Sequence, residues 1–135
     1  MNDQMLNKKW TDVEIVAFDL ETSGAYPLGS EIVEFGAVKW RGGQIVDQYQ
    51  TLLKPSEPMS VFNMGIHGIT NEMVAEAPLI ADKIAEIKHF FGNALLMAHH
   101  APFDLGFLAI EFEKNKITIP TGPVVCTSLL SRKII

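Results

Sequence analysis

Hydrophobic positions gather in three short runs in the first half of the chain, divided by segments that contain glycine and proline. The run Glu14–Leu20 is apolar and rich in β-branched residues, which predicts a buried strand. Apolar and polar residues alternate in part along Glu31–Trp40 and Gln44–Leu53, and only the tight turn Arg41–Gly43 divides these two runs. Because short turns join antiparallel neighbours, we expect a three-stranded antiparallel meander.

The second half alternates between helical and strand patterns. Lys54–Gly68 contains two prolines and two glycines and is expected to be a long loop. The remaining expected elements are a short helix Asn71–Ala77 capped by Thr70, a helix Leu79–Phe91, a strand Ala94–Ala98, a helix from Pro102 to about Lys114, a strand Val124–Cys126, and a last helix capped by Thr127. This order predicts an α/β domain with a mixed sheet, in which shorter parallel strands join the meander.

Composition narrows the class of protein. The 135 residues suit one domain, and a single cysteine, Cys126, suits a reducing cytoplasm. No secretory or membrane-spanning segment is visible in the sequence. The net charge of −5 argues against a grip along a long nucleic-acid duplex but is compatible with a small contact at a strand end.

Three carboxylates are the candidate chemical groups. Asp19 and Glu21 are two residues apart at the end of the first strand, so their side chains share one face. Asp104 lies in the first turn of the helix after Pro102, where parallel pairing of Ala94–Ala98 would bring it close to them. Clustered carboxylates favour binding of Mg²⁺ or Mn²⁺. Two such metal ions held side by side would support phosphodiester hydrolysis. The alternatives are a solvated strand end and an acid that stabilises a helix N-terminus.

Several motifs resemble one known family. Phe18–Gly24 resembles the first motif of the DnaQ-like (DEDD) 3′→5′ exonucleases, and Ala98–Leu108 is similar to their second motif. The nearest likeness is to proofreading epsilon-type members that serve bacterial DNA polymerase III. Further matches, in family order, are Glu31–Val38, Ile66–Thr70, Ala77-Pro78, and Cys126-Thr127 with Leu129, Leu130 and Arg132.

This resemblance implies a ribonuclease-H-like fold and hydrolysis of single-stranded DNA from its 3′ end by two Mg²⁺ or Mn²⁺ ions. It implies that Asp19, Glu21 and Asp104 are the catalytic metal ligands. It also implies substrate contacts for Thr22, His67, Ile69, His100 and Phe103. His100 stands where the family usually has Asn, so it is expected to act as a neutral hydrogen-bonding substitute, with a replacement base as the alternative.

The family's third motif, a late His-x5-Asp that supplies the general base and a fourth ligand, is missing. We therefore expect a single exonuclease domain, 1–135, truncated before its C-terminal helix and weak or inactive alone. An apolar surface exposed by that truncation would favour a homodimer. Alternative functions are RNA 3′-end trimming and a catalytically silent module that binds strand ends or a DNA polymerase subunit.

Overall fold

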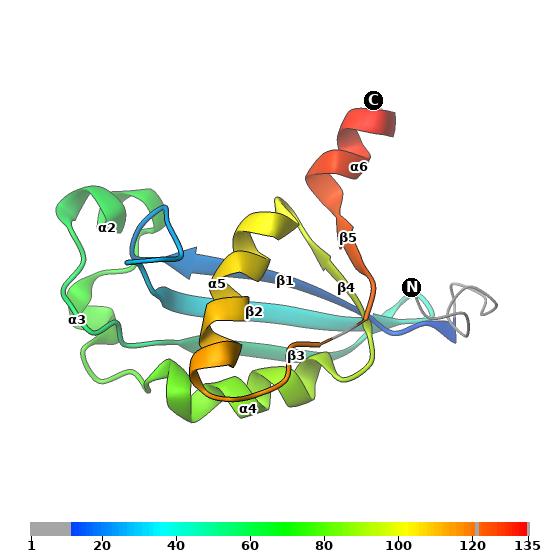
Figure 1. Cartoon of the computed structure of the whole chain (residues 1–135). Helices are drawn as coiled ribbons and strands as arrows, with labels where there is room; N and C mark the ends of the chain where they lie inside the picture. The colour runs from blue at the N-terminus through cyan, green and yellow to red at the C-terminus, as the bar shows by residue number, and fades with distance from the viewer. Residues whose placement is uncertain (1–11, 121, 135) are drawn as a thin grey trace.

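A five-stranded mixed sheet forms the centre of the protein (Figure 1). The computed structural model describes residues 12–120 and 122–134. The strand order is β3-β2-β1-β4-β5, where β1, β2 and β3 are antiparallel and β4 and β5 run parallel to β1. The strands are β1 (Ile15–Thr22), β2 (Ile32–Arg41), β3 (Gln44–Leu52), β4 (Leu95–Ala98) and β5 (Val124–Cys126). The mixed sheet predicted from the sequence is confirmed.

The β2–β3 hairpin turns at two glycines in the left-handed region. Gly42 has φ 59° and Gly43 has φ 83°, and Arg41 pairs with Gln44. Two consecutive positive φ angles give the tight turn whose twist matches a hairpin. This turn fixes the register in which β2 pairs with β3.

Two helices cover one face of the sheet and form the main core. They are α4 (Ile80–Phe91) and α5 (Ala101–Lys114), and Figure 1 shows both against the same side of the strands. Alternate residues of β1 point towards them: Val16, Phe18 and Leu20 are buried. Phe18 packs edge-on against Phe91, with 5.1 Å between ring centroids. The period of two along β1 therefore separates a core face from a face that carries Ala17, Asp19 and Glu21.

The prediction of a loop over Lys54–Gly68 is wrong for the second half of this segment, which forms helix α2 (Val61–His67). Ser60 Oγ accepts a hydrogen bond from Asn63 N at the start, and Gly68 ends the helix at φ 76°. α2 has no buried residue, so no apolar periodicity marked it in the sequence. Next along the chain, α3 (Asn71–Val74) is capped by Thr70 as expected, but it ends before the predicted Ala77.

The opposite face of the sheet is not covered by any helix of the described residues. Ala17 is exposed there, and Val38 and Met97 are half-buried. After β5, α6 (Thr127–Ile134) projects from the edge of the sheet (Figure 1). Thr127 is the first residue of α6. No helix in the described part of the chain is long and apolar enough to cross a membrane.

Candidate active site

Asp19 and Glu21 lie on the open face of β1, as their spacing predicted. Asp19 is exposed and pairs in register with Gly36 on β2. It lines an open depression of about 650 Å³ over β1, β2 and β3. No atom lies within 4 Å of the position that a Cβ on Gly36 would occupy. The side chain of Asp19 therefore borders open space that a ligand can enter.

Glu21 has a second carboxylate opposite it, which the sequence reasoning missed. It pairs with Glu34 on β2, immediately before a register shift between Glu21 and Thr22. Such irregularities re-aim side chains and are frequent beside active sites. Burial, followed by the charges of Asp19 and Glu34, raises the pKa of Glu21, while His67 lowers it. Glu34 in turn accepts a 2.8 Å hydrogen bond from Gln50 Nε2, and alternation along the Glu31–Trp40 strand was the available signal for it.

Asp104 lies in the first turn of α5, which follows β4, the neighbour of β1 on the side away from β2. β4 pairs in parallel with β1, with Ala17 opposite Met97, so the chain leaves β4 at the level of Asp19 and enters α5. Asp104 is only 3% exposed, and its Oδ2 is buried without a hydrogen-bond partner. Burial first, and then the charges of Asp19 and Glu21, raise the pKa of Asp104 to about 7.

These surroundings argue against a purely structural role for Asp104. A carboxylate that stabilises a helix N-terminus should be ionised and should accept hydrogen bonds from free backbone N–H groups. Asp104 instead leaves one oxygen unpaired and is held near two other carboxylates, an arrangement that costs free energy unless a cation or proton compensates. The orphaned oxygen and the all-oxygen donor set both fit a hard divalent cation.

The three acids do not form a ready-made metal cage. Within residues 12–120 and 122–134, no group of three or more His, Cys, Asp or Glu side chains is arranged to hold a metal ion as it stands. Mutual repulsion holds carboxylates apart when no cation lies between them. The electrostatic coupling of Asp104 to both other acids nevertheless places the three side chains in one neighbourhood.

His67, at the end of α2, has its ring oriented by a backbone hydrogen bond. Its Nδ1 accepts a 3.0 Å hydrogen bond from the backbone N–H of Ile69, so the proton of the neutral ring is on Nε2. Nε2 is buried and has no partner among the described residues. His67 also lowers the pKa of Glu21, so this ring lies near the acids.

The remaining predicted contact residues differ in their accessibility. Phe103 is 40% exposed and packs against Phe107, with 5.1 Å between ring centroids. Ile69, by contrast, is 5% exposed and belongs to a small core with Val33, so its side chain faces the interior. Thr22 donates a 2.7 Å hydrogen bond to the carbonyl of Gly24.

The junction before α5 contains two adjacent histidines. His100 is exposed and has a left-handed backbone with φ 55°, which is unusual for a residue other than glycine. The Nδ1 of His99 lies 2.9 Å from the hydroxyl of Thr127, and this contact links the junction to α6. Left-handed backbone geometry at a non-glycine residue is frequent at functional sites.

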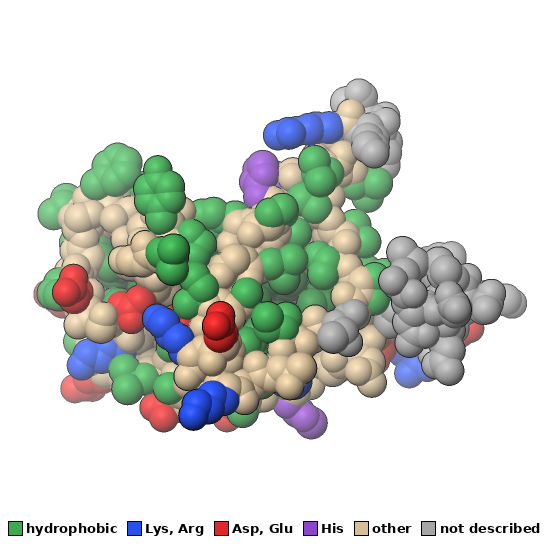
Figure 2. Space-filling model, viewed as in Figure 1, with side chains coloured by type: hydrophobic (Ala, Val, Ile, Leu, Met, Phe, Trp, Pro, Cys, Tyr) green, Lys and Arg blue, Asp and Glu red, His purple; other side chains and the backbone are tan. Residues whose placement is uncertain are grey.

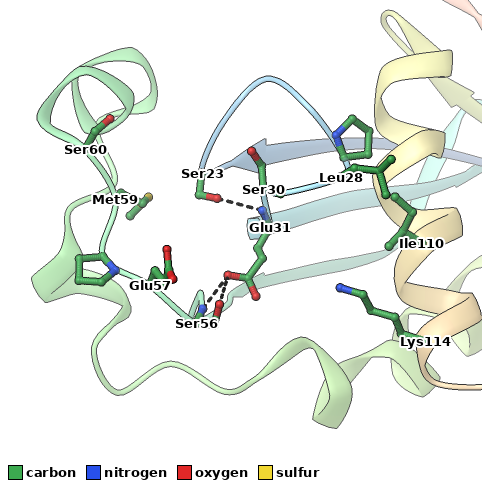
Figure 3. A pocket seen from close by; sticks show the side chains of 13 residues that line it. Ser23, Leu28, Ser30, Glu31, Ser56, Glu57, Met59, Ser60, Ile110 and Lys114 are labelled. Atoms are coloured by element: carbon green, nitrogen blue, oxygen red, sulfur yellow. Dashed lines mark hydrogen bonds between the residues drawn. The ribbon is translucent and has the colours of Figure 1, made fainter.

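A separate cavity of about 410 Å³ lies beyond the β1–β2 loop and contains none of the three acids (Figure 3). It is lined by that loop, the segment before α2, and Ile110 and Lys114 of α5. Glu31 closes one side by accepting hydrogen bonds from the backbone N–H and hydroxyl of Ser56. This cavity is therefore distinct from the cluster of acids.

Sequence relatives of the chain include bacterial DNA polymerases III of the PolC type. The chain is 38% identical over 134 residues to a DNA polymerase III PolC-type of Latilactobacillus sakei, with 99% of the chain and 9% of that protein covered. It is 43% identical over 124 residues to the PolC-type polymerase of Thermotoga maritima, covering 92% of the chain and 9% of the relative. The chain therefore spans less than a tenth of the length of these curated relatives.

Solved structures of exonucleases share the fold. Exonuclease X in complex with 5′-overhanging duplex DNA has 32% identity and a TM-score of 0.67, covering 89% of this chain and 63% of that one. A product-bound exonuclease I has a TM-score of 0.81 over 90% of this chain and 31% of its own, at 16% identity. The family model described as exonuclease (RNase_T) matches residues 16–135. The mixed sheet, its clustered acids and these matches agree that the chain belongs to the RNase_T, or DnaQ-like, exonuclease family.

Proposed function

We propose that this chain carries the active-site acids of a cytoplasmic 3′→5′ exonuclease that removes nucleotides from the 3′ end of single-stranded DNA during proofreading or repair. The observation that carries the proposal is Asp104, a buried carboxyl with an unpaired oxygen beside Asp19 and Glu21. A DNA-bound exonuclease and DNA polymerases among the relatives favour DNA and association with a polymerase.

Asp19, Glu21 and Asp104 would hold the divalent cations, Mg²⁺ or Mn²⁺. When bound, such ions supply activation of a water and stabilisation of the leaving oxygen in phosphodiester hydrolysis. The open depression beside Asp19 leaves room for the terminal phosphate. Glu34, held by Gln50, keeps a further negative charge beside Glu21 and so strengthens the attraction for a cation.

Neutral and apolar groups would position the terminal nucleotide. The half-exposed ring of Phe103 offers a surface on which a base of any sequence can stack. The Nε2–H of His67 can donate a hydrogen bond to a substrate oxygen. The backbone of Thr22 would border the same nucleotide. Because Nδ1 is engaged by the backbone N–H of Ile69, we assign His67 to substrate binding and not to the role of general base.

No histidine follows His100 in the sequence, so the His-x5-Asp base of the family has no counterpart in these residues. We therefore expect slow turnover, because a positioned base contributes about 10²–10⁴-fold to rate. His100, exposed beside the start of α5, is the histidine to test as a replacement base. An inert site that only binds strand ends is the alternative.

The test is cleavage of a 5′-labelled single-stranded DNA oligonucleotide in Mg²⁺ or Mn²⁺, resolved on a sequencing gel. We expect a ladder that shortens from the 3′ end and is lost with EDTA or Asp19→Asn. The matched control is Asp47→Asn, an exposed acid on β3 that accepts a hydrogen bond from the neighbouring Gln48 N. Cleavage that survives Asp19→Asn would reject the assigned site.

An RNA oligonucleotide of the same sequence distinguishes the two substrates. Equal or faster shortening of RNA would favour RNA-end trimming. If neither strand is cut but both bind, a version extended through a His-x5-Asp segment is the next measurement. Continued inactivity of that longer chain would leave the silent end-binding module as the better account.

A further inference from the structure

A fourth carboxylate lies directly across the sheet from one of the three acids. Glu34 on β2 is the register partner of Glu21 on β1. Residues paired in this way point to the same face of an antiparallel sheet, with Cβ atoms about 4.5–5.5 Å apart, and like charges at such positions are destabilising. No ion pair of the described residues involves either carboxylate. Within residues 12–120 and 122–134, the fold therefore keeps this negative pair without an ion pair to neutralise it.

Gln50 on β3 holds Glu34 without neutralising it. The Nε2 of Gln50 donates a 2.8 Å hydrogen bond to Oε2 of Glu34. Since β3 lies across β2 from β1, this bond turns the carboxylate of Glu34 away from Glu21. An amide carries no net charge, so the bond fixes the position of the carboxylate but does not cancel its charge. In the described part of the chain, no hydrogen bond reaches the other oxygen of Glu34 or the amide oxygen of Gln50.

These two acceptors flank open space beside Asp19. Gly36 is the register partner of Asp19 on one side and of Gln50 on the other, so the three residues form a row across β1, β2 and β3. Because Gly36 has no side chain, the centre of this row is open, and all three residues line the depression of about 650 Å³. Figure 2 shows the surface hollowed between α2 and α6, the region in which β1 ends in Figure 1. An ion that keeps its water molecules can therefore reach these acids.

The position of Glu34 suits contact through water better than direct ligation of a metal ion. One of its oxygens is already bound by Gln50, and no group of three or more His, Cys, Asp or Glu among the described residues is arranged to hold a metal ion as it stands. Mg²⁺ keeps several water molecules when one or two carboxylates bind it. Those waters are hydrogen-bond donors, and the free oxygens of Glu34 and Gln50 are acceptors at the right side of the proposed ligands.

We propose that Glu34 and Gln50 are positioning residues that accept hydrogen bonds from the water molecules of a divalent cation bound at Asp19 and Glu21. This inference rests on the proposed function, because it assumes that these acids bind such an ion. It goes beyond attraction by charge alone. The charge of Glu34 acts whether or not Gln50 is present, whereas a contact through water requires the carboxylate to be held in place.

Calorimetric titration with Mn²⁺ at constant ionic strength tests the proposal. Glu34→Gln keeps the size of the side chain but removes its charge, and Gln50→Ala keeps that charge but removes the hydrogen bond that holds it. Each variant should bind Mn²⁺ about 10-fold to 100-fold more weakly, the range for losing a group outside the ligand shell. Two controls should bind as the parent chain does. Asp47→Asn removes a charge elsewhere on β3, and Gln44→Ala removes a glutamine six residues before Gln50, about 20 Å along the strand.

Two further measurements distinguish a contact through water from a structural role. Hexaamminecobalt(III) has the shape of a hydrated Mg²⁺ ion, but its ammonia ligands do not exchange, so it binds only through hydrogen bonds that those ligands donate. Its affinity should also fall by about 10-fold or more in Glu34→Gln and in Gln50→Ala. In EDTA, Glu34→Gln should resist urea at least as well as the parent chain, because the repulsion between Glu34 and Glu21 is removed.

The outcomes separate this inference from the proposed function. If the parent chain binds Mn²⁺ and Asp19→Asn does not, unchanged affinity in Glu34→Gln or in Gln50→Ala would overturn the inference alone. Unchanged affinity in Gln50→Ala only would mean that the charge acts without a held contact. A variant that binds Mn²⁺ weakly and also unfolds more easily in EDTA would make its residue a structural one, which would overturn the inference as well. A parent chain that binds no Mn²⁺ would reject the metal site and this inference together.

Discussion

At the scale of a single residue, folding changes the acidity of the Asp104 carboxyl. Burial and two neighbouring carboxylates raise its pKa to about 7, so the folded protein holds a proton that the unfolded chain releases near pH 4. Between those values the native state binds more protons than the unfolded state. Stability contributed by this group is therefore present at low pH and is lost as pH rises towards 7.

The variant Asp104→Asn should remove this penalty. In EDTA at pH 8 we expect it to unfold with a free energy higher than that of the parent chain by about 1–3 kcal/mol, because no buried charge remains. At pH 5 the difference between the two proteins should be smaller than at pH 8, because only part of the penalty has developed one unit above the unfolded pKa. Urea unfolding at both pH values measures the difference, and a variant that is less stable at pH 8 would contradict the assigned environment.

Cys126 is the second residue whose environment changes its chemistry. Its Sγ lies 3.2 Å from the hydroxyl of Ser128 and accepts a hydrogen bond from the backbone N–H of Ala101. The Ser128 hydroxyl first, and then backbone N–H groups, lower the pKa of Cys126 to about 7. The rate of alkylation by iodoacetamide should therefore reach half its maximum near pH 7, since the thiolate is the nucleophile. In Ser128→Ala the midpoint should move to higher pH, and an unchanged profile would argue against the hydrogen bond as the cause.

At the scale of elements, the success of sequence reasoning followed the strength of each pattern. The meander was predictable because β-branched runs and the Gly42-Gly43 turn act locally. The spacing of Asp19 and Glu21 fixed their common face for the same reason. Asp104 required the long-range pairing of β4 with β1, which the family motif supplied and the local pattern did not. Glu34 escaped notice because its role depends on register across strands.

Helix α2 shows the opposite case. Of its apolar residues only Met64 packs against the core, so periodicity gave no signal. Ser60 and Gly68 mark the two ends of the helix. Two glycines near its C-terminus therefore make a matched pair. Gly68→Ala places a side chain at φ 76° and should destabilise the protein by about 1 kcal/mol. Gly65→Ala, in open space inside the helix, should stabilise it by up to about 1 kcal/mol. Urea unfolding of both variants checks the signs, and equal signs would contradict the assigned ends of α2.

The open face of the sheet is a property of the whole molecule. Ala17, Val38 and Met97 lie on it, and no helix of the described residues covers them. The homodimer expected from the sequence stays a prediction on this ground. Size exclusion with light scattering should give twice the 15.0 kDa chain mass, and Val38→Lys should return a monomer. The control is Ile45→Lys at the far end of β3, and a strictly monomeric parent chain would contradict the dimer.

The negative charge of the whole molecule links metal binding to the stability of the fold. The chain is acidic, and three of its carboxylates meet at one edge of the sheet, where repulsion opposes folding. A cation that binds only the folded form stabilises it by RT ln(1 + [L]/Kd), about 2.7 kcal/mol at a hundredfold excess over Kd.

Millimolar Mg²⁺ or Mn²⁺ should therefore raise the melting temperature of the parent chain and of Asp47→Asn by several degrees at pH 8. Asp19→Asn and Asp104→Asn should respond weakly, because each removes a ligand and part of the repulsion that the ion relieves. NaCl of equal ionic strength separates site binding from screening, and an equal response to NaCl would remove the support for a metal site at these acids.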